Sequence, residues 1–562
     1  MEGTGLRLQP DPTRLTVGRL LEDVAARHGD RLALRFEGRD WSYGDLERES
    51  RRLARALLAA GVAKGTRVAA LFGNRPEFVQ TFFAAGLVGA VLVPVNTFAA
   101  PDELDYVLRH GDASVLLLQA SLLKHRYRDG LVERHPELAR AAPGRVRCAA
   151  LPQLRRVVCL GPDAERGAVE AWDAFLARAD PVPDTLLDAA AREVHPADDG
   201  LVIYTSGTTA RPKGVIHLQR AAVIQSWRFA ELLGIEPEDR VWTAQPFFWT
   251  AGIAMSLGAT LAAGASLHLQ ESFEPGAALA CFEAERITTV HAWPHQEKAL
   301  AEHPDAARRD LSSVRKLRAT SPLAKLAGIE KDEWGPDAAY GLSETFTIVT
   351  ALPASAPVEK RRASHGAPLP GNVVRIVDPE TGRELPRGEA GEIAVKGTTL
   401  MRGYAKVEPE LVFDAEGFFR TQDGGWLDES GELHWTGRLS NLVKTGGANV
   451  SPVEVESALA SHPELRAALA VGVPHPTLGE ALVLCVVPRE GAHPEEAEIR
   501  SFLAGKLAAY KVPRCVLFFG ADELAYTGSQ KIQPGPLRDA ALRRLEREGA
   551  EIAGHRYADE RS

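Results

Sequence analysis

A loop rich in hydroxyl groups and glycine follows a short apolar segment near the middle of the chain. The apolar segment is Leu201-Val202-Ile203, and the loop reads Tyr204-Thr205-Ser206-Gly207-Thr208-Thr209-Ala210-Arg211-Pro212-Lys213-Gly214-Val215. Hydroxyl and backbone N–H groups donate hydrogen bonds to anionic oxygens, Lys213 adds a positive charge, and glycine lets a ligand approach the backbone closely. The residue order differs from the common phosphate loop, in which Gly-Lys is followed directly by Ser or Thr. Taken alone, the stretch fits a phosphate cradle and a surface loop equally well.

Several shorter segments further along the chain place charged or hydroxyl side chains beside glycine or turn residues. They are Tyr340-Gly341-Leu342-Ser343-Glu344-Thr345, Arg420-Thr421-Gln422-Asp423, Gly437-Arg438, Lys444-Thr445-Gly446-Gly447, Pro452-Val453-Glu454-Val455-Glu456 and Gly528-Ser529-Gln530-Lys531-Ile532. Each has an ordinary reading beside a functional one. Glu344 also suits a helix cap, Asp423 a turn, Arg438 an ion pair at a hinge, and Lys531 a solvated surface charge.

Alternating strand and helix signals surround these motifs in the first part of the chain. Apolar runs at 67–72, 91–95 and 114–118 predict strands, and helices are expected after a cap at Asp45, from Pro76, and over 101–109. Such alternation predicts parallel sheets with crossover helices. Residues 141–199 are rich in Ala, Arg, Pro and Asp, and we expect them to form a surface excursion.

The later part of the chain has a different pattern of predicted elements, with short strands separated by turns. Turn-rich segments at 380–384 and 387–391 flank short strands, which is typical of a small antiparallel barrel or sheet. Expected helices at 452–460 and 495–508 and strands at 467–473, 481–487 and 515–519 form a compact α+β unit. We therefore predict an α/β protein with a large N-terminal domain, residues 1–440, of doubly wound, mostly parallel sheets plus a small barrel-like sheet. A small, mobile α+β C-terminal domain, residues 441–562, follows a hinge near Asn441.

Length and composition limit the classes of function. The chain has 562 residues, too many for one hydrophobic core, and a net charge of −9, which argues against nucleic acid as a partner. Its five cysteines lack metal or disulfide spacing, and the first residues lack a signal pattern, so we expect a cytoplasmic protein. Residues 241–270 carry no Asp, Glu, Lys or Arg, but proline and glycines interrupt them. They favour a buried strand, turn and core helix over an integral membrane segment.

In this order and spacing, the motifs resemble those of the adenylate-forming (ANL) superfamily, which includes acyl-CoA synthetases, peptide-synthetase adenylation domains and beetle luciferases. The resemblance runs from about Trp41 to the end of the chain. Early support comes from Gly65-Thr66-Arg67-Val68-Ala69, Asn74-Arg75-Pro76-Glu77-Phe78 and Gly89-Ala90-Val91-Leu92-Val93-Pro94-Val95-Asn96. The motifs are weak singly and strong together.

The resemblance implies a two-step reaction that uses ATP, Mg²⁺ and coenzyme A. Binding of the β- and γ-phosphates would fall to Thr205, Ser206, Gly207, Thr208, Thr209 and Lys213. Ser343 would touch the α-phosphate, where the family usually has Thr, and Glu344 would hold Mg²⁺, a hard cation that prefers oxygen ligands. Tyr340 and Gly341 would lie along the adenine, and Asp423 and Arg438 at the ribose and phosphate.

The resemblance places the remaining catalytic groups on the small domain. Lys531 would bridge the attacking carboxylate and the α-phosphate, so that Lys531, Glu344 and Ser343 form the catalytic set. Between the steps the small domain would rotate about Asn441, whose side chain replaces the usual Asp or Lys. That rotation would bring Lys444, Gly446 and Gly447 to the pantetheine of coenzyme A.

The sequence departs from the family pattern where the acid and the adenine bind. Trp249 stands where relatives often have His, and no Asp is found there to pair with a substrate amine, which argues against an amino acid. An apolar acid pocket is predicted from Phe247, Phe248, Trp249, Trp293 and Gly341. Ala319 and Thr320 replace two glycines on the adenine side.

We therefore expect an AMP-forming acyl-CoA ligase that activates a bulky or long apolar carboxylic acid as its adenylate and transfers it to coenzyme A, in fatty acid or secondary metabolism. The replacements at Ala319 and Thr320 leave open a relative that only thioesterifies an acyl-AMP made by a partner enzyme. Loading onto a carrier protein in trans is the other alternative. The expected partners are the small acid and coenzyme A, with a homodimer as a further expectation.

Overall fold

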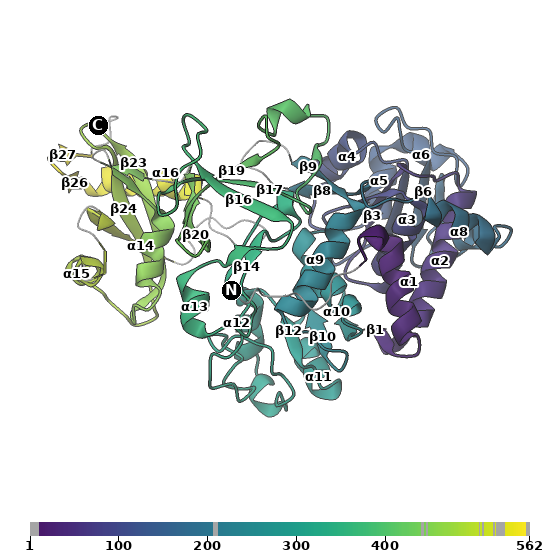
Figure 1. Cartoon of the computed structure of the whole chain (residues 1–562), viewed down its shortest axis with the longest axis horizontal. Coiled ribbons are helices and arrows are strands. Elements are labelled where there is room, and N and C mark those ends of the chain that lie inside the picture. Colours follow the sequence, from purple (N-terminus) through teal and green to yellow (C-terminus); the bar gives the residue numbers. More distant parts are fainter. Residues whose placement is uncertain are drawn as a thin grey trace. The chain divides into compact units, whose positions relative to one another are not determined.

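The computed structural model describes residues 11–205, 212–439, 443–445, 448–504, 506–507, 511–520, 523 and 534–557. Two compact units make up this part of the chain (Figure 1): the first lies within Met1–Val374 and Val395–Phe419, and the second within Arg375–Ala394 and Arg420–Ser562. The domain boundary predicted between residues 440 and 441 falls outside the described residues and stays a prediction.

An eight-stranded sheet organises one side of the first unit. Its strands, in spatial order, are β18 (Gly403–Tyr404), β9 (Lys213–Leu218), β8 (Asp199–Thr205), β4 (Val91–Pro94), β3 (Arg67–Leu71), β5 (Val115–Gln119), β6 (Arg156–Leu160) and β7 (Val169–Ala171). The strands from β8 to β7 pair in parallel, whereas β8, β9 and β18 pair antiparallel at one end. The predicted mostly parallel sheet is confirmed.

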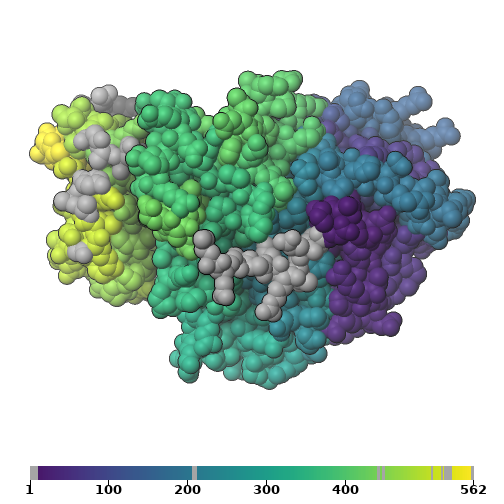
Figure 2. All heavy atoms as spheres, in the orientation of Figure 1, coloured from purple at the N-terminus to yellow at the C-terminus, as the bar shows by residue number. Residues whose placement is uncertain are grey.

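A second, five-stranded sheet lies in the same unit. Its order is β12 (Thr289–His291), β10 (Arg240–Thr243), β11 (Ser266–Leu269), β1 (Leu32–Phe36) and β2 (Arg39–Ser42), parallel except for the β1–β2 hairpin. The long helices of the unit are α1 (Val17–His28), α2 (Tyr43–Ala59), α3 (Pro76–Val88) and α9 (Gln219–Leu232). Figure 2 shows the purple and blue segments of this unit packed into a continuous surface.

Helix α3 illustrates how local signals and burial agree. Pro76 occupies its first turn and Gly89 ends it in the left-handed region at φ 69°, as such residues favour. Every residue of α3 except Glu77 is buried, and Phe78, Phe82 and Phe83 join one hydrophobic core with residues of both sheets, such as Leu92 and Leu267. A helix that is apolar all round belongs in a core between layers.

Two details of the first unit differ from the sequence prediction. Helix α2 begins earlier than expected, because Ser42 is its N-cap and Asp45 is the reciprocal partner three residues later in a capping box. Residues 141–199 are not only a surface excursion, since β6 and β7 within them extend the large sheet. Val157, Val158 and Cys159 are fully buried there, in a segment whose composition masks its strands.

Shorter elements complete the first unit. The helices are α4 (Pro101–His110), α5 (Tyr127–Arg134), α6 (Pro136–Arg140), α7 (Trp172–Leu176), α8 (Asp184–Arg192), α10 (Ala259–Ala262), α11 (Pro275–Ala284), α12 (Pro294–Glu302) and α13 (Val358–Ala363). One-turn 3₁₀ helices are η1 (Pro12–Arg14), η2 (Ala177–Ala179), η4 (Ala306–Arg308), η5 (Ser343–Thr345) and η6 (Pro409–Leu411), and η3 (Gly252–Gly258) is a π-helix. A small antiparallel sheet contains β13 (Ala339–Tyr340), β14 (Thr350–Ala351) and β15 (Ala367–Pro368).

The uncharged segment between Arg240 and Glu271 forms β10, η3, α10 and β11 in the core, as predicted. Within the described residues, no helix has the length and apolar character needed to cross a membrane. All five cysteines are free thiols.

The later strands form three further sheets. A four-stranded sheet has the order β16 (Asn372–Val377), β17 (Gly391–Gly397), β19 (Phe419–Leu427) and β20 (Leu433–Arg438). A five-stranded sheet joins β22 (Ala448–Val450), β21 (Val443–Thr445), β24 (Gly479–Pro488) and β23 (Leu465–His475), with β25 (Cys515–Phe518) beside β24. The hairpin of β26 (Glu551–Ile552) and β27 (His555–Arg556) is a separate two-stranded sheet. Helices α14 (Pro452–Leu459), α15 (Glu496–Ala504) and α16 (Pro534–Glu548) complete the predicted α+β unit.

Candidate functional site

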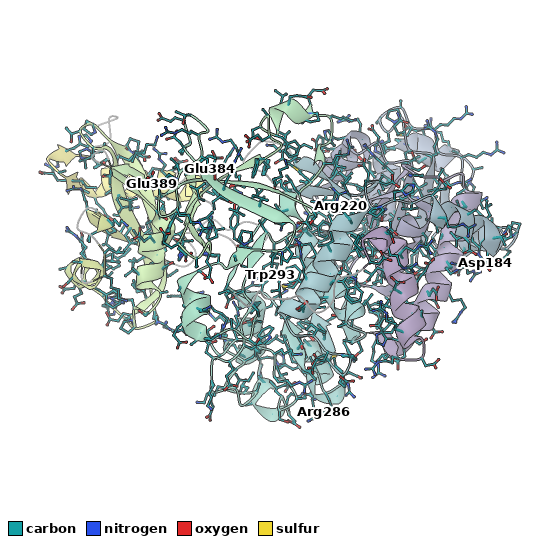
Figure 3. All side chains as sticks on the ribbon, in the orientation of Figure 1. Asp184, Arg220, Arg286, Trp293, Glu384 and Glu389 are labelled. Carbon is teal, nitrogen blue, oxygen red and sulfur yellow. The ribbon has the colours of Figure 1, made fainter. Side chains whose placement is uncertain are left out.

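Several predicted site residues of the first unit follow the carboxyl ends of parallel strands. Thr205 ends β8, the segment Phe247–Trp249 follows β10, and Trp293 follows β12. Figure 3 labels Arg286, which precedes β12, at the bottom of the view, and Trp293, which follows β12, higher in the view. In open α/β sheets, ligands bind beyond the carboxyl ends of the strands. Because β10 and β12 are parallel neighbours in the five-stranded sheet, Phe247–Trp249 and Trp293 come to the same edge of that sheet, whereas Thr205 ends a strand of the eight-stranded sheet.

Strand pairing fixes both ends of the hydroxyl-rich loop. Thr205 and Lys213 are register partners across the β8–β9 hairpin, so that the loop leaves and re-enters the sheet at adjacent positions. Helix α4 supports both ends: His110 Nδ1 lies 2.9 Å from Tyr204 Oη, and Tyr106 donates a hydrogen bond of 3.0 Å to the Pro212 carbonyl. The predicted phosphate ligands Ser206, Gly207, Thr208 and Thr209 lie outside the described residues.

Tyr404 connects the loop to Glu344, and the sequence motifs did not include this residue. The Lys213 ammonium lies 5.0 Å from the centroid of the Tyr404 ring, and Tyr404 Oη donates a hydrogen bond of 2.7 Å to Glu344 Oε1. Tyr404 reaches this place because β18 pairs with β9, with Tyr404 opposite Val215. Met401, three residues earlier, donates its backbone N–H to the Glu344 carbonyl at 2.7 Å. The Lys213 ammonium, the Tyr404 ring and the Glu344 carboxylate thus contact one another in sequence.

The turn that carries Ser343 and Glu344 is fixed from within the core. The buried Gln225 of α9 donates hydrogen bonds to the carbonyls of Thr345 (3.0 Å) and Ile348 (2.7 Å). Gly341 allows the two arms of the turn to approach closely, since a Cβ at this position would lie 2.1 Å from the Thr347 carbonyl oxygen. Tyr340, directly before it, is buried and pairs with Thr350 in the β13–β14 hairpin.

A buried histidine adjoins the same turn. The imidazole of His217 in β9 meets the Phe346 ring edge to face, with centroids 4.8 Å apart. Burial lowers the pKa of His217 to about 3, so the ring stays neutral at physiological pH. His217 therefore supports the turn by packing and adds no charge beside Glu344.

The donor chemistry of Glu344 fits the magnesium that the resemblance implies. Tyr404 binds Oε1, and among the described residues no hydrogen bond engages Oε2 of this half-buried carboxylate. A carboxylate oxygen on a fixed turn is a ligand that Mg²⁺ accepts together with phosphate oxygens and water.

The four aromatic residues predicted to line an acid pocket separate into two groups. Phe247 is 1% exposed and packs on Phe78 in the core, with ring centroids 5.5 Å apart. Phe248, Trp249 and Trp293 form an edge-to-face series instead, with centroid distances of 5.0 Å and 6.3 Å. Trp249 and Trp293 are half-buried, so their rings keep surface that a ligand can cover.

The segment that the resemblance places along the adenine is held by ion pairs. Arg318 pairs with the buried carboxylate of Glu297 (3.0 Å) and with Asp337 (3.1 Å). The chain then turns, with the Ser321 N–H donating to the Arg318 carbonyl, so that Ala319 and Thr320 lie inside a turn. The extra side chains at these positions are therefore accommodated by a regular local structure.

In the second unit, Asp423 and Arg438 lie opposite each other on β19 and β20. Arg438 Nε lies 2.9 Å from Asp423 Oδ1, and Arg438 also donates to the Thr421 carbonyl at 3.1 Å. The Asp423 side chain is 5% exposed and that of Arg438 is 47% exposed. The sequence predicted both residues at the ribose, and the structure shows them as one ion pair at a strand end.

The remaining predicted residues belong to the second unit or lie outside the described chain. Lys444 is exposed on β21, where its backbone N–H donates to Glu480 at 2.9 Å. Asn441, Gly446, Gly447 and Lys531 lie outside the described residues, and their roles stay predictions.

The chain matches two known families along its length. The family described as AMP-binding enzyme matches residues 21–405, and the AMP-binding enzyme C-terminal domain matches residues 454–531. The putative acyl-CoA synthetase YngI of Bacillus subtilis (strain 168) is 32% identical over 539 residues, which cover 94% of this chain and 97% of that protein. A feruloyl-CoA synthase of Amycolatopsis sp is 34% identical over 513 residues, covering 90% and 95%. The crystal structure of ATP-bound MatB from Rhodopseudomonas palustris matches with a TM-score of 0.75 and 28% identity, over 93% of this chain and 99% of that one.

Proposed function

The chain belongs to the AMP-binding enzyme family, and from this premise we propose that it is an acid–thiol ligase that joins an apolar carboxylic acid to coenzyme A. In the first step the carboxylate oxygen attacks the α-phosphorus of ATP, the bond to pyrophosphate breaks, and an acyl-adenylate forms. In the second step the sulfur of coenzyme A attacks the acyl carbonyl and AMP leaves. The first step thus releases pyrophosphate, and the second releases AMP beside the acyl-CoA.

The observation that carries the ATP-dependent step is the line from Lys213 through Tyr404 to Glu344. Two anions, the acid and the triphosphate, must approach each other, so fixed positive charge is needed around the phosphates. Lys213 brings a cation to one end of the loop, and Glu344 offers an oxygen ligand for Mg²⁺. When bound, Mg²⁺ would neutralise charge on the phosphate oxygens.

Other residues of the first unit position these groups. Gln225 fixes the turn that carries Ser343. We propose that the Ser343 hydroxyl donates a hydrogen bond to the α-phosphate. Tyr340 offers an aromatic face for the adenine. In the second unit, the Asp423 carboxylate would accept hydrogen bonds from the ribose hydroxyls while Arg438 holds it in place.

The acid that we propose is aromatic or otherwise bulky and apolar. Trp249 stands where relatives often have His, and its ring meets Trp293 edge to face at 6.3 Å. Half-buried tryptophans supply large apolar contact surfaces at little entropic cost. The 34% identical relative from Amycolatopsis is named a feruloyl-CoA synthase, which supports an aromatic acid.

A panel of aromatic and aliphatic acids, each incubated with ATP, Mg²⁺ and coenzyme A, tests this proposal by mass spectrometry. Acyl-AMP and acyl-CoA are measured separately, and the expected result is that both form with an aromatic acid. A parallel reaction with synthetic acyl-AMP and coenzyme A distinguishes a ligase that only thioesterifies, because that enzyme would respond to this reaction alone. Transfer to a phosphopantetheine carrier protein in place of coenzyme A would identify the other alternative.

Replacing Tyr404 by Phe is expected to lower the rate of adenylate formation by about 5- to 10-fold, since one hydrogen bond to a charged acceptor is lost. The change keeps the ring beside Lys213 and removes only the hydroxyl that holds Glu344. Pyrophosphate release at varied Mg²⁺ measures the effect, and the Mg²⁺ requirement should rise. Tyr127→Phe is the matched control, because that buried hydroxyl donates to the Thr97 carbonyl instead. Equal rates in the two variants would contradict a positioning role.

Replacing Trp249 by Ala is expected to lower kcat/KM for the best aromatic acid by about 30-fold, the effect of losing about 2 kcal/mol of contact. Bulkier acids should lose less, because the truncated side chain leaves room for them. Phe247→Leu serves as control, since Phe247 packs on Phe78 in the core and should affect stability more than acid preference. Unchanged preference in the Trp249 variant would place the acid elsewhere.

A further inference from the structure

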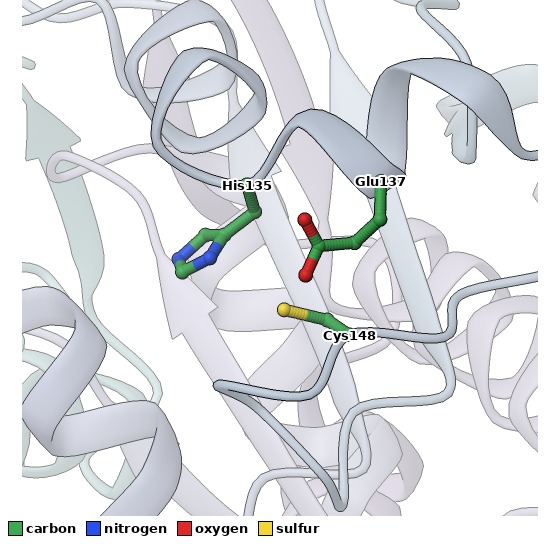
Figure 4. Close-up of side chains that lie close together, drawn as sticks. All are labelled: His135, Glu137 and Cys148. Atoms are coloured by element: carbon green, nitrogen blue, oxygen red, sulfur yellow. The ribbon is translucent and has the colours of Figure 1, made fainter.

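Three side chains with metal-binding donor atoms meet away from the residues discussed above. His135 lies between α5 and α6, Glu137 lies in the first turn of α6, and Cys148 comes from the segment that leads to β6. Their donor atoms, an imidazole nitrogen, a carboxylate oxygen and Sγ, all lie within 4.8 Å of one another. Figure 4 shows the carboxylate and the sulfur directed toward each other, beside the imidazole ring.

The orientation of His135 is fixed by a second carboxylate. Its Nε2 lies 3.0 Å from Asp105 Oδ1 of α4, and Asp105 Oδ2 in turn accepts a hydrogen bond of 2.8 Å from Arg134. Histidines that bind metals usually donate their other ring N–H to a carboxylate, which fixes the tautomer and makes the free nitrogen a better ligand. With Nε2 turned to Asp105, Nδ1 is the ring nitrogen left for the cluster.

The turn that carries Cys148 is closed by a backbone hydrogen bond of 3.2 Å, which the Leu151 N–H donates to the Cys148 carbonyl. Burial and the neighbouring Glu137 side chain raise the pKa of the Cys148 thiol. The thiol therefore keeps its proton until an ion binds.

We propose that His135, Glu137 and Cys148 form a site for one divalent ion of the zinc class, with Asp105 as the outer carboxylate that orients His135. As the ion binds, the Cys148 thiol releases its proton to solvent, and the resulting thiolate and the Glu137 carboxylate supply two negative charges for a divalent cation. One sulfur, one nitrogen and one oxygen donor suit Zn²⁺ or Co²⁺ and not Mg²⁺, which requires oxygen ligands. Three protein ligands leave the fourth position of a tetrahedral ion to water.

The surroundings allow an ion to enter. His135 and Cys148 are buried at 5% and 6% exposure, yet Cys148 also lines a surface cavity of about 590 Å³. The other residues that line it are Val146, Arg147, Ala149, Pro152 and Arg155. Arg155 is turned to the Pro152 carbonyl, to which it donates at 2.6 Å, and Arg134 is paired with Asp105 and Asp102. The guanidinium groups of Arg155 and Arg134 are therefore held by these partners and do not bind the donor atoms of the cluster.

The ion would join two segments that are separate in the sequence. It would connect the α5–α6 junction with the segment before β6, a strand inside the large sheet. Since binding favours the folded state, the ion should raise the melting temperature of the chain. This inference is independent of the ligase reaction and of the Mg²⁺ that accompanies ATP.

The test uses the full chain without a histidine tag, freed of metal with a chelator and then given Zn²⁺ or Co²⁺ alone. We expect about one equivalent of ion per chain, a higher melting temperature, and a thiolate-to-cobalt absorption band. Cys148→Ser should remove the band, and His135→Gln and Glu137→Gln should weaken binding. Cys281→Ser is the matched control, since this thiol on α11 lies outside the cluster and should leave the band intact.

Asp105→Asn tests the outer carboxylate and should weaken Zn²⁺ binding by about 10- to 100-fold while keeping the cobalt band at high ion concentration. Melting curves of the metal-free proteins show which variants fold like the original chain, and Glu137→Gln preserves shape if Cys148→Ser does not fold. The proposal is overturned if the original chain binds no Zn²⁺ or Co²⁺, or if folded Cys148→Ser and Glu137→Gln bind the ion as tightly as the original chain.

Discussion

Replacing Glu344 by Gln is expected to lower the rate of adenylate formation by about 10²- to 10³-fold, the range for losing one preorganised charge contact at a reacting centre. The amide keeps the shape of the side chain and one oxygen, so Tyr404 can still donate its hydrogen bond. The negative charge that attracts Mg²⁺ is lost. The effect should therefore fall on catalysis and leave the fold intact.

Three measurements separate this expectation from general damage. Pyrophosphate release with acid and ATP gives the adenylation rate, and raised Mg²⁺ should restore part of it. The reaction of synthetic acyl-AMP with coenzyme A should continue at most of its original rate. Glu359→Gln, at an exposed position on α13, is the matched control and should behave as the original chain. An adenylation rate in Glu344→Gln equal to that of the control would remove Glu344 from the metal site.

Replacing Lys531 by Met is expected to separate the two half-reactions. The resemblance places this lysine at the attacking carboxylate and the α-phosphate, where a cation offsets the repulsion of two anions. Its loss should slow adenylation by about 10²- to 10³-fold. Methionine keeps the length of the side chain and removes its charge. Lys531 lies outside the described residues, so this experiment tests a prediction from sequence directly.

The second half-reaction gives the control within the same protein. Thioester formation from synthetic acyl-AMP needs no attack on a phosphate, so the Lys531 variant should retain most of that rate. Lys506→Met is the matched surface variant: its ammonium contacts the Ala458 carbonyl and Ser461, neither of which is a predicted site residue. Loss of both half-reactions in Lys531→Met with normal melting behaviour would contradict a role confined to adenylation.

Local patterns predicted much of the fold because they act over a few residues. Pro76 and Gly89 delimit α3, and apolar runs give β3, β4 and β5 nearly as expected. The prediction was wrong for residues 141–199, where β6 and β7 are short strands in a segment rich in Ala, Arg and Pro. Strand β6 is paired by β5 and strand β7 by β6, and neither pairing has a local signal in the sequence.

The candidate site divides in the same way between sequence and structure. The motifs predicted Lys213, Glu344, Asp423 and Arg438 as site residues from residue types and order alone. The structure pairs Asp423 with Arg438 across two strands. It also separates Phe247, which is core, from the half-buried Trp249. Aromatic side chains look alike in sequence because burial depends on which side of a segment faces the core.

The sequence by itself determined the family, the order of the elements and the residue types available for chemistry, since these depend on local composition and motif order. Only the tertiary structure brought Tyr404 to Glu344, Gln225 to the turn at 345–348, and Cys148 to His135 and Glu137. Each of these contacts joins residues far apart in the chain or in separate elements. They arise from strand order and helix packing, which fix long-range distances that no short segment encodes.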